Sequence, residues 1–137
     1  MTKLQRLAFI GLIKQAVKYL QSGQTNLVPE FHHGDCIGAD AEAANIFRLC
    51  ISPNILVSHP PLNPSKRAYV LSAEVRPEKE YLERNQDIVN ETAFLIACPK
   101  EFAGEELRSG TWSTVRYARK VGKRVTIVRP DGTIKHE

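Results

Sequence analysis

Apolar residues recur along the first twenty positions of the chain with the period of an α-helix. These residues are Leu4, Leu7, Ile10, Ile13, Val17 and Leu20. Their spacing of three or four predicts a helix that turns them toward the core. Thr2 and Gln5 form a capping box at its start, because the Thr hydroxyl and the Gln side chain accept hydrogen bonds from free backbone N–H groups. Ser22-Gly23 predicts the end of the helix.

The rest of the chain alternates short apolar runs with helical patterns. The predicted strands are residues 26–32, 54–58, 92–98 and 124–129. The predicted helices are residues 39–49, a segment that begins near Pro77, and residues 111–121. Such alternation is typical of an α/β fold. We therefore expect one Rossmann-like domain over residues 1–137, with a doubly wound, mostly parallel sheet and helices on both faces.

Three of these elements carry specific packing predictions. Residues 92–98 are nearly all apolar and predict the most deeply buried strand. The helix near Pro77, a favoured first helical position, is expected to turn four side chains inward: Tyr81, Leu82, Ile88 and Val89. The last helix is expected to pack three side chains on the sheet: Trp112, Val115 and Ala118.

Composition narrows the class of protein. The chain has 137 residues, enough for one domain with a normal core. It lacks a run of about 20 apolar residues, so we expect no membrane span. Three cysteines without a C-x-x-C pair suit a reducing cytoplasm better than a disulfide framework. The net charge of +4 favours anionic partners such as nucleotides but is far from that of a dedicated nucleic-acid binder.

Polar clusters follow three of the predicted strands. They span residues 33–40, 59–67 and 99–111. In open parallel sheets, ligands bind outside the carboxyl ends of the strands, so we expect the clusters to share one site. Glycine turns that lead into helices let backbone amides approach a phosphate. The predicted ligand-binding residues are His33, Gly34, Asp35, Gly38, Asp40, His59, Pro60, Arg84, Asn85, Ser109, Gly110 and Thr111.

Several of these residues also have a purely structural interpretation. Asp40 is placed to cap the helix that follows it, and Ser109 or Thr111 can cap the last helix. Arg84 lies four residues after Glu80, the spacing of an exposed helical ion pair. As a ligand-binding residue, Arg84 would contact phosphate with its forked guanidinium. Lys66 and Arg67 are either solvated loop residues or further phosphate contacts.

The same segments contain potential metal ligands and nucleophiles. These are His32, His33, Asp35, Cys36, His59 and Cys98. No pair of them has a recognised zinc-ligand spacing, and they come from three separate segments. We therefore predict neither a metal nor a cofactor. A nucleophile built from Cys36 and a histidine is likewise not favoured.

Three ordered segments carry a family resemblance. Residues 33–40 (HGDCIGAD) are similar to an H-G-G-x-x-G-A-D turn, and residues 81–89 (YLERNQDIV) to an R-N-x-x-[ML] helix. Residues 109–111 (SGT) and 117–123 (YARKVGK) are similar to a G-G-T turn and the helix after it. Together they resemble the small single-domain branch of the SLOG superfamily, which also contains the LOG phosphoribohydrolases and the DprA/Smf DNA-processing proteins. The resemblance implies a site that binds a nucleotide or a nucleotide-derived ligand.

The chain departs from the family pattern at its start. Family members begin with a β-strand and a glycine-containing loop, whereas this sequence opens on a helix. Either Met1 is an internal start that removes native residues, or the protein manages without a central strand. A lost central strand would leave two strand edges unpaired, which a second chain can cover. For this reason, and because relatives often dimerise, we expect a homo-oligomer.

A second departure concerns catalysis. The LOG phosphoribohydrolases carry a glutamate after their glycine turn, but here Thr111 is followed by Trp112-Ser113-Thr114-Val115. We therefore favour a binding module or sensor. An N-glycosidase acting on nucleoside 5'-monophosphates is the first alternative, with Asp35 and Arg84 as catalytic candidates and Asp40 or Glu105 as further carboxylates. A DprA-like nucleic-acid-binding module is the second, using the basic residues Arg116, Arg119, Lys120, Lys123 and Arg124.

Overall fold

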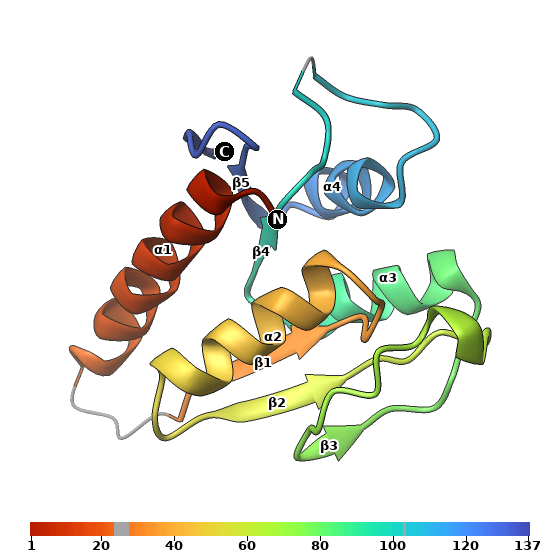
Figure 1. The fold of residues 1–137 in the computed structure, drawn as a ribbon, viewed down its shortest axis with the longest axis horizontal. Coiled ribbons are helices and arrows are strands. Elements are labelled where there is room, and N and C mark those ends of the chain that lie inside the picture. Colours follow the sequence, from red (N-terminus) through yellow and green to blue (C-terminus); the bar gives the residue numbers. More distant parts are fainter. Residues whose placement is uncertain (24–27, 103) are drawn as a thin grey trace.

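The computed structural model describes residues 1–23, 28–102 and 104–137 (Figure 1). In chain order its elements are α1 (Lys3–Gln21), β1 (Glu30–His33), α2 (Ala39–Cys50), β2 (Ile55–Ser58), the 3-10 helix η1 (Pro64–Lys66), β3 (Glu74–Val75), α3 (Tyr81–Glu91), β4 (Phe94–Ala97), α4 (Gly110–Lys120), β5 (Arg124–Val128) and β6 (Ile134–His136). This alternation confirms the predicted α/β class. Among the described helices, none combines the length and apolar character needed to cross a lipid bilayer.

The strands form two small, mostly parallel sheets. In the first, β1 pairs with β2 and β2 with β3, all in parallel. In the second, β4 pairs in parallel with β5, and β5 pairs antiparallel with β6. The sequence prediction missed β3 and β6, which have two and three residues. Segments this short and exposed carry no alternation that distinguishes a strand from a loop.

The facing edges of β1 and β4 carry no strand partner. Among the described strands, β1 pairs only with β2, and β4 pairs only with β5. Two cavities of about 140 and 260 Å³ lie between the sheets. Both are lined by Phe31 and His32 of β1 and by Leu95 and Ile96 of β4. Within the described residues, two unpaired strand edges thus border a hollow between the sheets.

Helix α1 runs along the side of the molecule and reaches both sheets (Figure 1). Its capping box is formed as predicted, with the Thr2 hydroxyl accepting from the Gln5 N–H at 3.0 Å. The predicted inward face was wrong in part, because Leu4 and Leu7 are 57% and 58% exposed. The buried residues are Gln5, Phe9, Leu12, Ile13 and Val17. The predicted inward residues and the residues that are buried both recur with a helical period. Periodicity alone therefore could not show which set faces the core.

Helix α3 begins later than predicted. It starts at Tyr81, with Glu80 as its N-cap residue, and not near Pro77. Lys79 forms an isolated β-bridge with Pro61, which holds the chain before the helix extended. Tyr81 and Leu82 were expected to point inward but are 47% and 61% exposed. The buried residues of α3 are Arg84 and Val89.

The second sheet and α4 also test the packing predictions. Trp112, Val115 and Ala118 are buried against this sheet as expected, in a cluster with Val125 and Ile127. The prediction that 92–98 is the most buried strand was wrong. Phe94 at the start of β4 is 37% exposed, whereas β5 buries most of its length. The open edge of β4 accounts for this difference.

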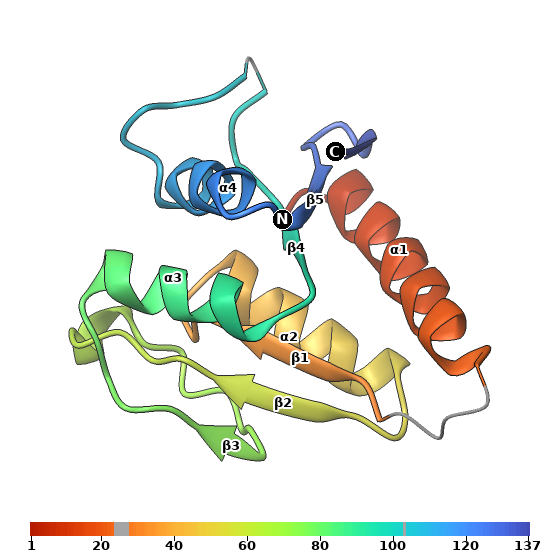
Figure 2. The same ribbon diagram turned by 180° about the vertical axis from the view of Figure 1, so that it is seen from behind.

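The predicted boundaries of the first strand and the last helix need small corrections. Residues 26 and 27 of the predicted strand 26–32 lie outside the described residues, and β1 begins at Glu30. Helix α4 begins at Gly110, one residue before the predicted start, and ends at Lys120. Seen from behind, α3 lies over the first sheet, and α4 lies beside α3 on the side of the second sheet (Figure 2). Their packing brings the start of α4 close to the start of α3.

Candidate functional site

The smaller cavity collects residues from the three segments that carry the family resemblance. The cluster at 59–67 contributes no lining residue, so the expectation that the three polar clusters share one site was wrong in part. The turn after β1 contributes His33, Gly34 and Asp40, helix α3 contributes Arg84 and Asn85, and the start of α4 contributes Gly110 and Thr111. Of the predicted ligand-binding residues, Asp35, Gly38, His59, Pro60 and Ser109 do not line it. The two glycine turns therefore lie at the same cavity, with α3 between them. This arrangement does not follow from the order of the segments in the chain.

Arg84 is the central side chain of this cavity. It is only 2% exposed, and its Nη1 donates to the carbonyl oxygens of Gly34 and, at 3.4 Å, of His59. Its guanidinium also lies 4.8 Å from the centre of the Tyr81 ring. Within the part of the chain that the structure describes, its buried Nε has no hydrogen-bond partner. A buried guanidinium with an unused N–H is costly unless an acceptor arrives.

Gly34 is required by this close approach. A Cβ at Gly34 would overlap Arg84 Nη1 and lie 2.6 Å from Asp40 Oδ2. Glycine is thus needed here for space, and its backbone conformation is not left-handed. The turn that was predicted to bind phosphate is held against α3 by Arg84, a residue of that helix.

Tyr81 is a site residue that the sequence prediction assigned to the core. A Cβ at Gly110 would overlap the Tyr81 hydroxyl and lie 2.7 Å from Tyr81 Cζ. The Tyr81 ring therefore bridges the Arg84 guanidinium and the start of α4. Because the ring is nearly half exposed, it closes one side of the cavity without being locked in the core.

The start of α4 offers backbone donors to the cavity. The first N–H groups of a helix have no acceptor within the helix, and Gly110 and Thr111 lie in this first turn. Ser109 is the N-cap, and its hydroxyl accepts from the Trp112 N–H at 3.4 Å. The capping interpretation of Ser109 is therefore correct. No acidic residue lies within the first turn of α4, although the Glu101 carboxylate accepts from Trp112 Nε1 at 3.2 Å. The positive end of the helix dipole favours a negative group at Gly110 and Thr111.

The start of α2 differs in charge from the start of α4. Its N-cap is Gly38, with φ of 110°, so the prediction that Asp40 caps this helix was wrong. Asp40 lies inside the first turn and accepts from the Cys36 N–H at 3.4 Å. Desolvation in the cavity raises the pKa of Asp40, and Arg84, 3.9 Å away, opposes this shift. The carboxylate of Asp40 thus already places a negative group at the start of α2.

Asp35 has a structural role in this fold. It is fully buried, and its two carboxylate oxygens accept from Arg67 Nε and from the Val70 N–H, both at 2.9 Å. Arg67 also lies 3.4 Å from Glu78 and over the ring of Tyr69. Asp35 thus fastens the loop after η1 to the turn after β1. Lys66 is exposed beside it.

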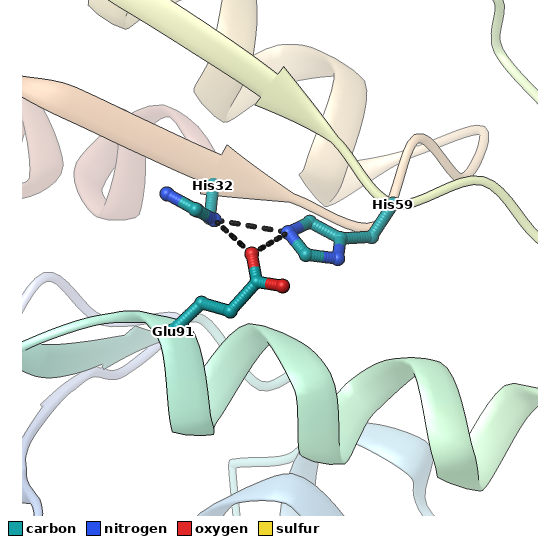
Figure 3. Close-up of side chains that lie close together, drawn as sticks. All are labelled: His32, His59 and Glu91. Carbon is teal, nitrogen blue, oxygen red and sulfur yellow. Dashed lines mark hydrogen bonds and ion pairs between the residues drawn. The ribbon is translucent and has the colours of Figure 1, made fainter. Parts of the chain in front are cut away.

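His59 and Pro60 are buried and do not line the cavity that contains Arg84 and Thr111, although the His59 carbonyl contacts Arg84 from behind it. His59 Nε2 is 2.9 Å from His32 Nδ1, and Glu91 Oε2 lies 3.5 Å from each of these nitrogens (Figure 3). The three side chains come from β1, the end of β2 and the end of α3. Both histidines are potential metal ligands in the sequence. No sequence motif links them to Glu91, which lies 32 positions after His59.

One of the basic residues around the last helix is paired with carboxylates. Arg119 lies 2.6 Å from Glu105 and 2.7 Å from Glu137. Lys123 donates to the Thr92 carbonyl at 2.7 Å, and Arg116 donates to the Leu107 carbonyl at 3.0 Å, contacts that orient these side chains but leave their charge in place. The ion pairs of Arg119 offset part of the positive charge that the nucleic-acid alternative requires. They also hold Glu105 on the surface, outside the residues that line the cavity.

Comparison with known proteins gives no relative from which to transfer a function. The chain matches no protein-family model, no curated protein and no solved structure at a significant level. The function of this chain must therefore be inferred from the geometry of the site and from the sequence resemblance.

Proposed function

We propose that this chain is a SLOG-type, Rossmann-like domain of the cytoplasm that binds a nucleotide or a nucleotide-derived ligand between its two sheets. The observation that carries the proposal is the buried Arg84 Nε, which lacks an acceptor among the described residues and belongs to a side chain lining the same cavity as the start of α4. A cationic donor and free helix amides together favour an anion. The parallel strand pairs support the Rossmann-like, doubly wound assignment.

The charges around the cavity support one orientation of the ligand. A phosphate belongs at Gly110 and Thr111, because α4 has no acidic residue in its first turn. Asp40 would repel a phosphate but would accept hydrogen bonds from ribose hydroxyl groups. The larger, apolar cavity shares Phe31, Ile88 and Leu95 with the smaller one and offers space for the base. The ligand would then extend from the turns toward α1.

Thermal unfolding against a ligand panel tests this proposal. The panel contains nucleoside mono-, di- and triphosphates, cyclic nucleotides, NAD and ADP-ribose. At 100 times its dissociation constant, a bound ligand adds about 2.7 kcal/mol to the free energy of unfolding. We expect at least one compound to raise the melting temperature of the wild type, and Thr111→Val to reduce the shift by removing a hydroxyl from the cavity.

Thr126→Val is the matched control, because Thr126 lies on β5 and does not line the cavity. It should leave the ligand-induced shift unchanged. A panel in which no compound shifts the wild type contradicts the proposal. A compound that shifts the wild type and Thr111→Val equally would place its site elsewhere.

A nucleoside monophosphate N-glycosidase is the second candidate, and one observation favours it. Asp40 is a carboxylate that lines the cavity and whose raised pKa suits a general acid. Asp35 and Glu105 are engaged with Arg67 and Arg119. Incubation with nucleoside 5'-monophosphates should then release free base, and Asp40→Asn should abolish the release. If the wild type releases no base from any of them, the chain is not this enzyme.

A further inference from the structure

Two histidines and one glutamate converge between β1, β2 and α3 (Figure 3). We propose that His32, His59 and Glu91 bind a divalent transition-metal ion, for which zinc has the best-fitting geometry. The donor atoms are His32 Nδ1, His59 Nε2 and Glu91 Oε2. This proposal does not depend on the proposed nucleotide function.

The distances between the donor atoms fit a tetrahedral ion. They are 2.9 Å between the two nitrogens and 3.5 Å from each nitrogen to the carboxylate oxygen. With metal–ligand distances of about 2.05 Å, neighbouring donors in a tetrahedral zinc site are about 3.3 Å apart. A point about 2.05 Å from all three atoms lies about 0.7 Å out of their plane, as in a regular tetrahedron. The side chains can therefore hold an ion with little movement.

The exposure of the three side chains also suits a metal site, because imidazole nitrogens and carboxylate oxygens are ordinary zinc ligands and one of them must be reachable from solvent. The side chains of His32 and His59 are 5% and 2% exposed, whereas that of Glu91 is 37% exposed. The glutamate thus offers a route by which an ion enters from solvent.

Arg76 shapes the affinity of this site. Its Nε lies 3.2 Å from the same oxygen of Glu91, and its Nη1 lies 2.7 Å from Glu74. A carboxylate oxygen has two lone pairs, so it can accept from Arg76 and coordinate an ion together. The hydrogen bond orients the carboxylate, as outer partners of metal ligands commonly do. The nearby positive charge weakens binding, so the affinity should be lower than that of a thiolate site.

Three protein ligands leave one position of the tetrahedron for water or another molecule. Structural zinc sites normally use four protein ligands, whereas sites with two histidines and one glutamate keep an exchangeable position. His32 lines both cavities and Glu91 lines the larger one. An ion at this site would therefore lie at the wall of the hollow between the sheets.

Metal titration of the full chain tests the proposal. After dialysis against a chelator, Zn²⁺ is titrated by calorimetry and Co²⁺ by visible absorption, with no nucleotide present. We expect one ion per chain and the intense visible bands of tetrahedral Co²⁺. Glu91→Gln keeps the shape of the side chain but removes the anionic ligand, so it should weaken binding by at least about tenfold.

Two controls separate the site from general binding. Glu83→Gln changes a carboxylate on the same helix whose side chain is 62% exposed, and His136→Gln removes an exposed histidine; both should bind as the wild type does. His59→Gln provides a second loss-of-ligand variant. No uptake by the wild type, or equal uptake by Glu91→Gln, would show that the three side chains form only a hydrogen-bonded cluster. Thiolate-to-cobalt charge transfer would assign the ion to the cysteines and overturn the proposal.

Discussion

At the scale of single residues, the contact between Gly34 and Arg84 organises the site. The guanidinium reaches the Gly34 carbonyl because Gly34 has no side chain. Among the described residues, the buried Nε of Arg84 has no hydrogen-bond partner. The glycine at position 34 is therefore explained by the space that Arg84 occupies.

Gly34→Ala should therefore destabilise the protein. The added methyl group overlaps a buried guanidinium that is held by hydrogen bonds, and such overpacking costs about 1–3 kcal/mol. Urea unfolding of wild type and variant measures the change. Gly11→Ala is the matched control, because Gly11 lies within α1 with open space around it. It should stabilise the chain by about 0.5–1 kcal/mol. Equal stability of Gly34→Ala and wild type would contradict the packing described for Arg84.

Residue types in the sequence predicted part of this site. The turn at Gly34 and the turn at Gly110 meet at one cavity, as expected for polar clusters that follow parallel strands, but the cluster at 59–67 does not reach it. Arg84 and Asn85, which also line the cavity, were predicted from the family resemblance. The partners of each side chain could not be predicted. Asp35 is used to hold Arg67, and Tyr81 closes the cavity from an exposed position. Both depend on loop conformations that local pattern does not determine.

At the scale of elements, Gln5 connects α1 to the second sheet. Its side-chain nitrogen donates to the carbonyls of Pro99 at 2.9 Å and Val128 at 2.8 Å, and the residue is 2% exposed. The Pro99 carbonyl follows the end of β4, and the Val128 carbonyl belongs to the last residue of β5. A polar side chain on the buried face of α1 thus sets the position of the helix.

Gln5→Leu should lower the free energy of unfolding by about 1–3 kcal/mol, because it leaves buried carbonyls without a donor. Gln15→Leu, an exposed substitution on the same helix, should change it by less than about 0.5 kcal/mol. Chemical denaturation of both variants makes the comparison. Similar stabilities would mean that the two hydrogen bonds of Gln5 contribute nothing to the docking of α1.

Element boundaries were predictable where local signals were strong. The capping box of α1, the alanine-rich α2 and the apolar face of α4 all gave nearly correct helices. The start of α3 was not predicted correctly, because a β-bridge between Lys79 and Pro61 keeps the residues before the helix extended. The inward face of α1 was mistaken for a similar reason: burial of Gln5 depends on carbonyls more than ninety residues away.

At the scale of the whole molecule, the hollow between the two sheets is the main feature. β1 and β4 present open edges to it, and both cavities lie there. The expectation of a homo-oligomer remains a prediction, with the unpaired edges as its physical reason. The nucleotide proposal depends on the same hollow, because α3 and the starts of α2 and α4 line one cavity there.

The most direct test of that proposal is an NMR titration of the ¹⁵N-labelled chain with the compound that gives the largest thermal shift. The proposal predicts that amide signals of Gly34, Gly110 and Thr111 and the side-chain N–H signal of Arg84 move together with one dissociation constant. Signals of β6, far from the cavity lining, should stay in place. Movement confined to other residues, with these four unchanged, would contradict the nucleotide site.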